Sequence, residues 1–262
     1  MARSKILITG VCGLLGQNLV RAMHQDNDLI GVDILPEPAY LKGLVRYQLL
    51  DISSPDAVKN TLGELNPDVI INTAAITNVD ACEKEQEKTD LINHRAVRFL
   101  LGALEKDARF VQLSSDYVFD GKNGPYIDEA KPNPVSFYGL SKLRAENAVN
   151  EHPGDHLIVR TMVIFGNGIN LKPDFLTWVR TSLTAGKEIT VVTDQTGNIT
   201  LASNLAENIR VLLKNEIKGI VSLSGSDILS RYDIAVETAR FYGLNPSTQA
   251  GFSPRSILCM QR

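Results

Sequence analysis

Short apolar runs alternate with longer amphipathic segments through the first 160 residues of this 262-residue chain. The apolar runs are candidate strands, and they span Ile6–Thr9, Leu29–Asp33, Val45–Leu49, Val69–Asn72, Phe110–Ser114 and Leu157–Arg160. The segments between them are candidate helices, and they span Leu15–Gln25, Asp56–Leu65, Lys88–Asp107 and Tyr138–Asn150. Strands that alternate with helices favour parallel βαβ units with right-handed crossovers. The alternation therefore predicts an α/β fold with a doubly wound parallel sheet.

Beyond Arg160 the alternation becomes less regular. Helical patterns and short apolar runs follow one another over Phe175–Ala185, Ile189–Thr193, Ala202–Lys214, Ile220–Leu223 and Arg231–Tyr242. The stretch from Asp194 to Asn198 has the composition of a turn. We therefore expect a larger domain over residues 1–160, whose last sheet strands come partly from beyond residue 160. Residues 161–262 are expected to form mainly a smaller C-terminal lobe.

The composition excludes several classes of partner. The formal net charge is −3 and Lys and Arg form no runs, so we expect no binding to nucleic acid or to an anionic membrane. No apolar run approaches the roughly 20 residues that span a bilayer. Cys12, Cys82 and Cys259 form no CxxC pair, and the four histidines lack metal-ligand spacing. These features favour a cytoplasmic protein without a disulfide framework or a bound metal.

A glycine-rich loop with the spacing GxxGxxG joins the first expected strand to the first expected helix. Glycines at such a junction allow a tight turn and let the backbone approach a pyrophosphate, whose charge free N–H groups at the helix N-terminus stabilise. A plain strand–turn–helix is the alternative interpretation. Cys12 within the loop is interpreted as a small filler, whose thiol pKa the helix N-terminus would lower. The loop indicates a Rossmann-type dinucleotide-binding domain, with contacts expected from Gly10, Cys12, Gly13, Leu14, Leu15 and Gly16.

An acidic residue, Asp33, ends the next expected strand 23 residues after Gly10. A carboxylate at this position accepts hydrogen bonds from the adenosine ribose hydroxyls and repels a 2′-phosphate. No arginine immediately follows Asp33 to hold such a phosphate. The sequence therefore favours NAD(H) and leaves NADP(H) open. A strand-end aspartate that only caps a turn is the alternative interpretation.

Three polar residues combine a strand end with the expected helix over Tyr138–Asn150. Tyr138 and Lys142 form a YxxxK motif, and residues four apart lie on one face of a helix. Lys142 is then placed to lower the pKa of the Tyr138 phenol, which makes it a usable proton donor or acceptor near neutral pH. Ser115, 23 residues before Tyr138, supplies a hydroxyl that can polarise a substrate oxygen beside the phenol. These three residues are the candidate catalytic residues, and an exposed helix pair is the alternative interpretation of YxxxK.

Longer stretches give the chain a resemblance to a known family. They are LSSDYVFDG at 113–121, continued by Pro125-Tyr126, Glu129 and YGLSK at 138–142; INTAAITNVD at 71–80, with Asn93 in the helix that follows; and DQTGNIT at 194–200. These stretches resemble dTDP-4-dehydrorhamnose reductase, a family of extended short-chain dehydrogenases. In the last stretch, Ile199 stands where that family has proline. The resemblance runs from the glycine loop to about residue 245.

The resemblance implies that NADH or NADPH reduces the C4 ketone of a nucleotide-activated deoxy sugar, a step that forms dTDP-L-rhamnose for surface polysaccharides. It implies that Tyr138 protonates the oxygen at C4, that Lys142 also holds the nicotinamide ribose, and that Ser115 orients the carbonyl. The further cofactor contacts that it implies are Asp51, Ile52, Ala74, Ala75 and Asn93. The substrate contacts that it implies are Thr77 and Asp116 and, in a substrate-binding C-terminal lobe, Met162, Gln195, Thr200 and Arg255.

Two departures from the family concern the lobe that chooses the substrate. Met162 stands where the family often has an aromatic residue, and residues 254–258 match the family's C-terminus only roughly. Two other interpretations therefore stay open: a nucleotide-sugar epimerase or dehydratase that recycles tightly held NAD, and a regulatory subunit resembling the β subunit of methionine adenosyltransferase. The expected partner is a nucleotide-sugar substrate, and a homodimer is one assembly that the sequence leaves open.

Overall fold

The computed structural model describes residues 3–105, 108–244 and 252–255. Within these ranges, no helix is long and apolar enough to cross a membrane. The chain divides into two compact units, and the larger one comprises Met1–Thr161 and Ser203–Leu223. The segment 203–223 thus packs with the first 161 residues and not with its neighbours in sequence.

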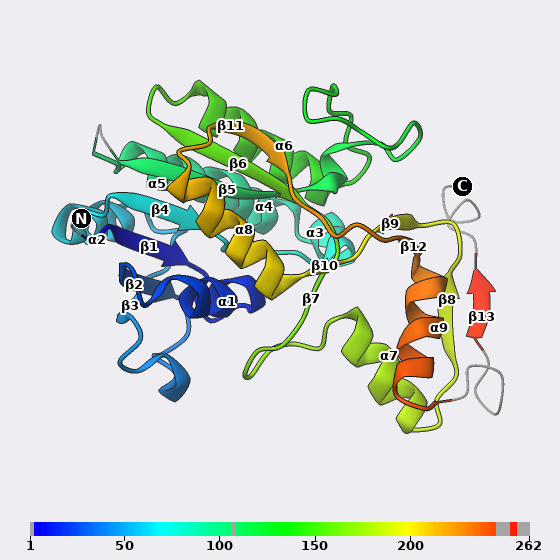
Figure 1. Cartoon of the computed structure of the whole chain (residues 1–262). Coiled ribbons are helices and arrows are strands. Elements are labelled where there is room, and N and C mark those ends of the chain that lie inside the picture. The colour runs from blue at the N-terminus through cyan, green and yellow to red at the C-terminus, as the bar shows by residue number, and fades with distance from the viewer. Residues whose placement is uncertain (1–2, 106–107, 245–251, 256–262) are drawn as a thin grey trace. The chain divides into compact units, whose positions relative to one another are not determined.

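The larger unit contains one seven-stranded sheet, in the order β11-β6-β5-β4-β1-β2-β3 (Figure 1). All neighbouring strands are parallel. This is the Rossmann order 3-2-1-4-5-6 with one more strand beside the sixth. The predicted doubly wound α/β fold is therefore confirmed. The strands are β1 (Lys5–Thr9), β2 (Asp28–Asp33), β3 (Arg46–Leu49), β4 (Val69–Asn72), β5 (Arg109–Ser115), β6 (His156–Thr161) and β11 (Gly219–Ser222).

Helices cover both faces of this sheet (Figure 1). Helices α2, α5 and α6 pack on one face, where their apolar side chains join those of the strands. Helices α1 and α8 cover the other face, and Arg210 of α8 lies 4.0 Å from Asp26, just after α1. The helices of this unit are α1 (Leu14–Met23), α2 (Pro55–Leu65), α3 (Val79–Lys84), α4 (Gln86–Asp90), α5 (Ala96–Gly102), α6 (Phe137–Glu151) and α8 (Ala202–Lys214), of which the first residue belongs to the smaller unit.

Local sequence explains where helix α2 begins and ends. Ser54 caps the helix, and its Oγ accepts the N–H of Ala57 at 3.5 Å. Pro55 occupies the first helical position, where no N–H donor is needed. Asn66 ends the helix in the left-handed region, with φ of 43°, a conformation that asparagine tolerates.

The helix expected over residues 88–107 is present as one helical stretch, but it begins at Gln86, ends at Gly102 and contains a π-helical turn that was not expected. Helix α4 ends at Asp90, a π-helical turn spans Leu91–Arg95, and α5 ends at Gly102. The physical reason lies at Asn93 on the π-turn, whose side chain bonds the backbone of Ile76, after β4. A π-turn inserts an extra residue into a helix and so re-aims its side chains. Residues 106–107 lie outside the described part of the chain.

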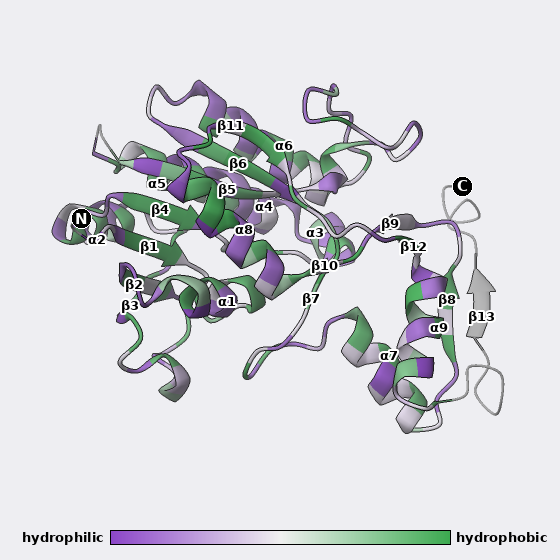
Figure 2. Cartoon of the chain, viewed as in Figure 1, coloured by the Kyte–Doolittle hydropathy of each residue, from purple (hydrophilic) through white to green (hydrophobic). Residues whose placement is uncertain are grey.

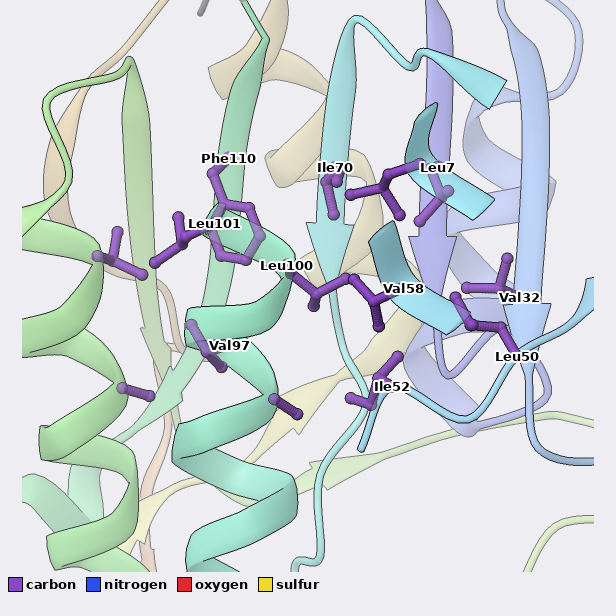
Figure 3. Packing of buried hydrophobic residues seen from close by; sticks show 14 of the residues in the cluster. Leu7, Val32, Leu50, Ile52, Val58, Ile70, Val97, Leu100, Leu101 and Phe110 are labelled. Carbon is purple, nitrogen blue, oxygen red and sulfur yellow. The ribbon is translucent and has the colours of Figure 1, made fainter. Parts of the chain in front are cut away.

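One core cluster of the larger unit lies between the sheet and helices α2, α5 and α6 (Figure 3). Its buried side chains come from β1, β2, β4, β5 and β6, and Ile70 and Phe110 within it are fully buried. Figure 2 shows hydrophobic residues along most of these strands. Strands that are covered on both faces are expected to be apolar throughout. This core fixes the carboxyl ends of the strands, where the candidate site residues lie.

The smaller unit comprises Met162–Ala202 and Ser224–Arg262, and its described part contains two helices with three two-stranded sheets. Its core cluster consists of Val179, Ile189, Val191 and Ala235. The elements are β7 (Ile164–Phe165) with β10 (Thr200–Leu201), β9 (Thr196–Asn198) with β12 (Ile228–Ser230), β8 (Ile189–Val192) with β13 (Phe252–Arg255), α7 (Phe175–Thr184) and α9 (Arg231–Phe241).

The stretch 194–198, expected as a turn, contains a short strand. Strand β9 covers Thr196–Asn198 and pairs antiparallel with β12. Asn198 also donates from its Nδ2 to the carbonyl of Gly225 at 2.7 Å. A turn-rich composition was misleading here because the pairing partner comes from residues 228–230, which local composition does not reveal.

Candidate active site

The glycine loop makes backbone contacts that a side chain would prevent. Gly10 has a φ of 64°, and a Cβ at this position would lie 3.0 Å from the backbone of Ala74, just after β4. A Cβ at Gly16 would lie 2.5 Å from the carbonyl oxygen of Gly10. Both positions therefore require glycine, and the loop passes as close to its neighbours as a dinucleotide cradle demands.

The backbone N–H groups of the loop fall into two sets. Those of residues 11–13 bond acceptors inside the unit. Those of Leu14 and Leu15 belong to the first turn of α1, where N–H groups lack intrahelical partners. The cap residue, Gly13, brings no side chain to bond them. These N–H groups lie at the positive end of the helix dipole, so they fit a pyrophosphate.

Two backbone N–H groups fix the carboxylate of Asp33 at the end of β2. Cys12 donates to Oδ2 at 3.0 Å, and Leu35 donates to Oδ1 at 3.2 Å. The residue is half-buried, and a carboxylate has more acceptor sites than these two bonds occupy. Asp33 therefore fits the ribose hydroxyls of a dinucleotide, and its charge opposes a 2′-phosphate.

The thiol of Cys12 lies beside this carboxylate. Its Sγ is 3.8 Å from the phenol oxygen of Tyr47, and the residue is buried. Burial and, after it, the negative charge of Asp33 raise the pKa of the Cys12 thiol. The expected lowering by the helix N-terminus is therefore wrong, because loss of hydration and a nearby carboxylate both disfavour the thiolate.

The remaining expected cofactor contacts in this half of the sheet differ in exposure. Asp51 is exposed after β3, and its Oδ1 accepts the N–H of Ser53 at 2.9 Å. The side chain of Ile52 is buried in the core cluster under α2, α5 and α6, so only its backbone remains for a ligand. Ala74 and Ala75 follow β4 and are half-buried, and Thr77, an expected substrate contact, is exposed beyond them.

Ser115 and Tyr138 come together where β5 ends and α6 begins. The Ser115 hydroxyl donates to Oδ1 of Asp116 at 2.9 Å, accepts the N–H of Tyr117 at 3.3 Å and hydrogen-bonds the phenol of Tyr138. The ring of Tyr138 packs edge-on against that of Tyr117, with centroids 5.4 Å apart. The structure thus brings together three residues that the sequence singled out: Ser115, Asp116 and Tyr138.

The glycine inside the YGLSK motif explains this approach. A Cβ at Gly139 would overlap the carbonyl oxygen of Tyr117, which lies in the 3₁₀ turn η3 (Asp116–Val118). Ser136 caps α6, and its Oγ accepts the N–H of Gly139 at 3.1 Å. Only glycine lets the first turn of α6 touch η3, so Gly139 sets the position of the neighbouring phenol.

Burial raises the pKa of the Tyr138 phenol above its ordinary value, the hydrogen bond with Ser115 lowers it, and the charge of Asp116 raises it further. The sequence predicted a pKa lowered by Lys142, and this prediction is wrong. Lys142 donates instead to a backbone carbonyl, and the loss of hydration dominates. The phenol therefore stays protonated and can act as a proton donor.

Lys142 is buried on the same face of α6, one turn after Tyr138. Its Nζ donates to the carbonyl oxygen of Leu113 at 2.5 Å. Burial lowers the pKa of Lys142 to about 8, and the charge of Glu146 acts in the opposite direction. The side chain is therefore mostly an ammonium at neutral pH, near the pH at which it loses its proton.

Asn93, an expected cofactor contact, bonds groups of the protein. Its Oδ1 accepts the N–H of Ile76 at 2.8 Å, and its Nδ2 donates to the Ile76 carbonyl at 2.9 Å and to the Ser141 hydroxyl at 3.0 Å. Ser141 lies between Tyr138 and Lys142 and donates to the Tyr138 carbonyl at 2.7 Å. Asn93 therefore ties the segment after β4 to the turn of α6 that carries Tyr138 and Lys142.

Sequence reasoning missed a buried charged pair next to these residues. Glu146, one turn after Lys142, and Arg160 of β6 are joined by two bonds of 2.7 and 2.9 Å. Their side chains are only 1% and 3% exposed. A signal was present in the sequence, because Arg160 is a charged residue in an apolar strand and Glu146 extends YxxxK to YxxxKxxxE.

Two expected substrate contacts of the smaller unit lie at the turn-rich stretch 194–198: Met162 packs on it, and Gln195 is part of it. The Cε of Met162 lies 3.1 Å from the place that a Cβ on Gly197 would take, so Met162 packs on this stretch. Gln195 is held by Arg231, whose backbone N–H donates to the Gln195 carbonyl at 3.0 Å and whose Nε donates to its Oε1 at 3.4 Å. The smaller unit thus places Met162 and Gln195 around one stretch of chain.

The other two expected substrate contacts of the smaller unit are placed differently. Thr200 is buried, and its hydroxyl accepts the N–H of Gly225 at 3.4 Å. Arg255 ends strand β13, and its side chain lies outside the described part of the chain. The hydroxyl of Thr200 therefore bonds the backbone of its own unit.

Residues 4–255 match the family described as RmlD substrate binding domain. The dTDP-4-dehydrorhamnose reductase of Escherichia coli (strain K12) is 34% identical over 250 residues, with 91% of this chain and 79% of the relative covered. The spore coat polysaccharide biosynthesis protein SpsK of Bacillus subtilis (strain 168) is 32% identical over 244 residues, covering 92% and 80%. The likeness therefore extends over nearly the whole chain.

A solved structure of dTDP-4-dehydrorhamnose reductase from Bacillus anthracis, in complex with NADP, superposes with a TM-score of 0.86. It is 27% identical, and the match covers 99% of this chain and 86% of that one. A hypothetical dTDP-4-dehydrorhamnose reductase from Sulfolobus tokodaii superposes with a TM-score of 0.84 at 33% identity, covering 96% and 85%.

Proposed function

The chain belongs to the family of the RmlD substrate binding domain, and from this premise we propose that it reduces the C4 ketone of a nucleotide-activated deoxy sugar with a nicotinamide dinucleotide. The observation that carries the proposal is the meeting of Ser115, Tyr138 and Lys142 at the carboxyl end of β5. The glycine cradle after β1 lies on the same edge of the same sheet. Relatives named dTDP-4-dehydrorhamnose reductase support this reaction.

The chemistry divides between the cofactor and three side chains. When bound, the reduced nicotinamide supplies a hydride to the carbonyl carbon. Tyr138, which burial keeps protonated, donates its proton to the carbonyl oxygen as general acid. The Ser115 hydroxyl, whose proton would turn from Asp116 to the carbonyl oxygen, would hold that oxygen beside the phenol. The ammonium of Lys142 does not set the resting pKa of the phenol, but it lies one helical turn away and would stabilise the negative charge left on the phenol after proton transfer. It would also bond the nicotinamide ribose.

Asp33 carries the proposal that NADH is preferred over NADPH. Its carboxylate is fixed by two N–H groups and opposes the extra phosphate of NADPH. The Bacillus anthracis neighbour was solved with NADP, so the two cofactors must be compared directly. In the same proposal, the smaller unit binds the substrate with Gln195 and Arg255, and the protein acts in the cytoplasm.

The proposal is tested by mixing the full chain with dTDP-4-keto-6-deoxy sugars and either NADH or NADPH. We expect loss of absorbance at 340 nm, faster with NADH, and a product two hydrogens heavier by mass spectrometry. Matched controls are the nucleotide sugar without a keto group and the Tyr138→Phe variant.

Two outcomes would contradict the proposal. An epimerase or dehydratase would convert the sugar without net consumption of NADH. A regulatory subunit would bind the dinucleotide, turn over no keto sugar and co-purify in fixed ratio with another polypeptide.

A further inference from the structure

Three neighbouring residues of β5, at positions 113–115, each contact a different one of the first three turns of α6. The Ser115 hydroxyl bonds the phenol in the first turn, and the carbonyl at position 113 accepts Lys142 in the second. In the third turn, the Ser114 hydroxyl donates to Oε1 of Glu146 at 2.5 Å. Glu146 is therefore part of the same strand–helix contact that places the two residues of YxxxK.

Arg160 holds this carboxylate from the neighbouring strand. Its Nε and Nη2 donate to the two oxygens of Glu146, a planar two-bonded geometry that fixes the direction of the carboxylate. Its Nη1 donates to the carbonyl of Asp128 at 3.0 Å, and its guanidinium lies 5.0 Å from the ring centre of Phe119. Asp128 and Phe119 belong to the segment that follows Ser115 and η3, so one guanidinium joins β6, α6 and this segment.

The charges around Lys142 are few. On its own helix it meets Glu146 one turn later and the neutral Tyr138 one turn earlier. From β5 it meets the carbonyl of Leu113, and Arg160 of β6 bonds the carboxylate of Glu146. Charges interact strongly when both are removed from water. The single negative group next to this buried ammonium is thus Glu146, among the described residues.

We propose that Glu146, held in place by Arg160, is a positioning residue of the active site that keeps Lys142 a charged ammonium bonded to β5 at neutral pH. The inference rests on the proposed function, because it concerns the residue that would stabilise charge on Tyr138. A pair that served folding alone would act equally well as two apolar side chains, since buried ion pairs are often replaceable by apolar ones without loss of stability. An electrostatic effect of Glu146 on Lys142 and a purely structural role of the ion pair therefore predict different results.

The test is a titration of Lys142 in the full, cofactor-free chain, which requires no turnover. Lysines are labelled with ¹³C at the ε carbon, and the Lys142 signal is identified by its absence in Lys142→Met. We expect Glu146→Gln to move its titration midpoint down by about one pH unit or more, the size of shift that a nearby opposite charge produces. Arg160→Met, which leaves the carboxylate without its partner, should move the midpoint up.

The double variant Glu146→Gln with Arg160→Met keeps the test decisive if a single variant does not fold. The nearer charge is the negative one, so we expect a smaller downward shift than in Glu146→Gln alone. In the keto-sugar assay, the alkaline limb of kcat should move in the same direction as each midpoint, while the KM for NADH changes little. A midpoint that stays at the wild-type pH in every folded variant would overturn the inference and leave the pair a purely structural role. If no keto sugar is reduced by the wild type, the proposed function fails, and the titration still decides the charge effect.

Discussion

The two units of this protein differ in what holds them together. The core of the larger unit draws buried side chains from five parallel strands and three helices. The described core of the smaller unit consists of four buried side chains from α7, β8 and α9. Burial of apolar surface is the main stabilising term in folding, so it stabilises the larger unit more than the smaller one.

The candidate functional residues follow this difference. Ser115, Tyr138 and Lys142 lie on a strand end and a helix of the larger unit. The expected substrate contacts Met162 and Gln195 lie beside short strands of the smaller unit. Catalytic groups must be held within fractions of an ångström, whereas binding loops tolerate variation. We therefore expect chemistry to depend on the larger unit and substrate choice on the smaller one.

The largest expected effect is on chemistry in the larger unit. Tyr138→Phe removes the proton donor, and general acid catalysis contributes roughly 10²- to 10⁴-fold. We expect kcat to fall by about this factor, while NADH affinity, measured by fluorescence titration, barely changes. A parallel loss of cofactor binding would instead assign Tyr138 a structural role.

A matched pair of core truncations compares the two units directly. Ile70→Ala in the larger unit should lower the free energy of unfolding by about 2–5 kcal/mol. Ile189→Ala in the smaller unit should lie at the lower end of that range, because the small cluster can close over the gap. Urea unfolding resolves the two, since the single tryptophan, Trp178, is on α7 of the smaller unit and far-ultraviolet dichroism reports mainly the larger one. Equal losses of unfolding free energy in the two variants would contradict the expected difference between the two cores.

A third effect concerns the cofactor. Asp33→Ala removes acceptors for the ribose hydroxyls, and a hydrogen bond to a charged group contributes about 1.5–3 kcal/mol. We expect NADH affinity to fall by about 10- to 100-fold and NADPH affinity to fall less or to rise, as measured by fluorescence titration. A wild-type protein that binds NADPH more tightly would show that the interpretation of Asp33 is wrong.

The smallest expected effect is on substrate recognition in the smaller unit. Gln195→Ala removes a side chain that Arg231 already engages, so the KM for the nucleotide sugar should rise by several-fold, about 1 kcal/mol for one hydrogen bond. The kcat and the KM for NADH should stay near wild type. Asn208→Ala, an exposed position on α8, is the matched control. A fall in kcat alone would place Gln195 in the chemical step and blur the division between the units.

Most of the correct predictions came from two features of the sequence: the alternation of strand and helix patterns, and motifs whose residues lie close together in the chain. The sheet, the glycine cradle and the Ser115–Tyr138 contact each follow from a short stretch of sequence read with strand–helix alternation. What failed depends on burial or on distant partners. The pKa directions of Cys12 and Tyr138 are set by lost hydration, which a motif does not report. The Glu146–Arg160 pair was missed because its two halves lie 14 residues apart, on different elements.

The central claim is that the chain transfers a hydride to a sugar ketone while Tyr138 adds the proton. The most direct measurement uses NADH that carries deuterium at the transferred position of the nicotinamide, with a dTDP-4-keto-6-deoxy sugar. We predict a product that carries one deuterium, located at C4 by NMR. The Tyr138→Phe variant should form almost none of this labelled product. A sugar that turns over without acquiring deuterium, or a protein that binds the labelled NADH and never delivers it to a keto sugar, would contradict the account.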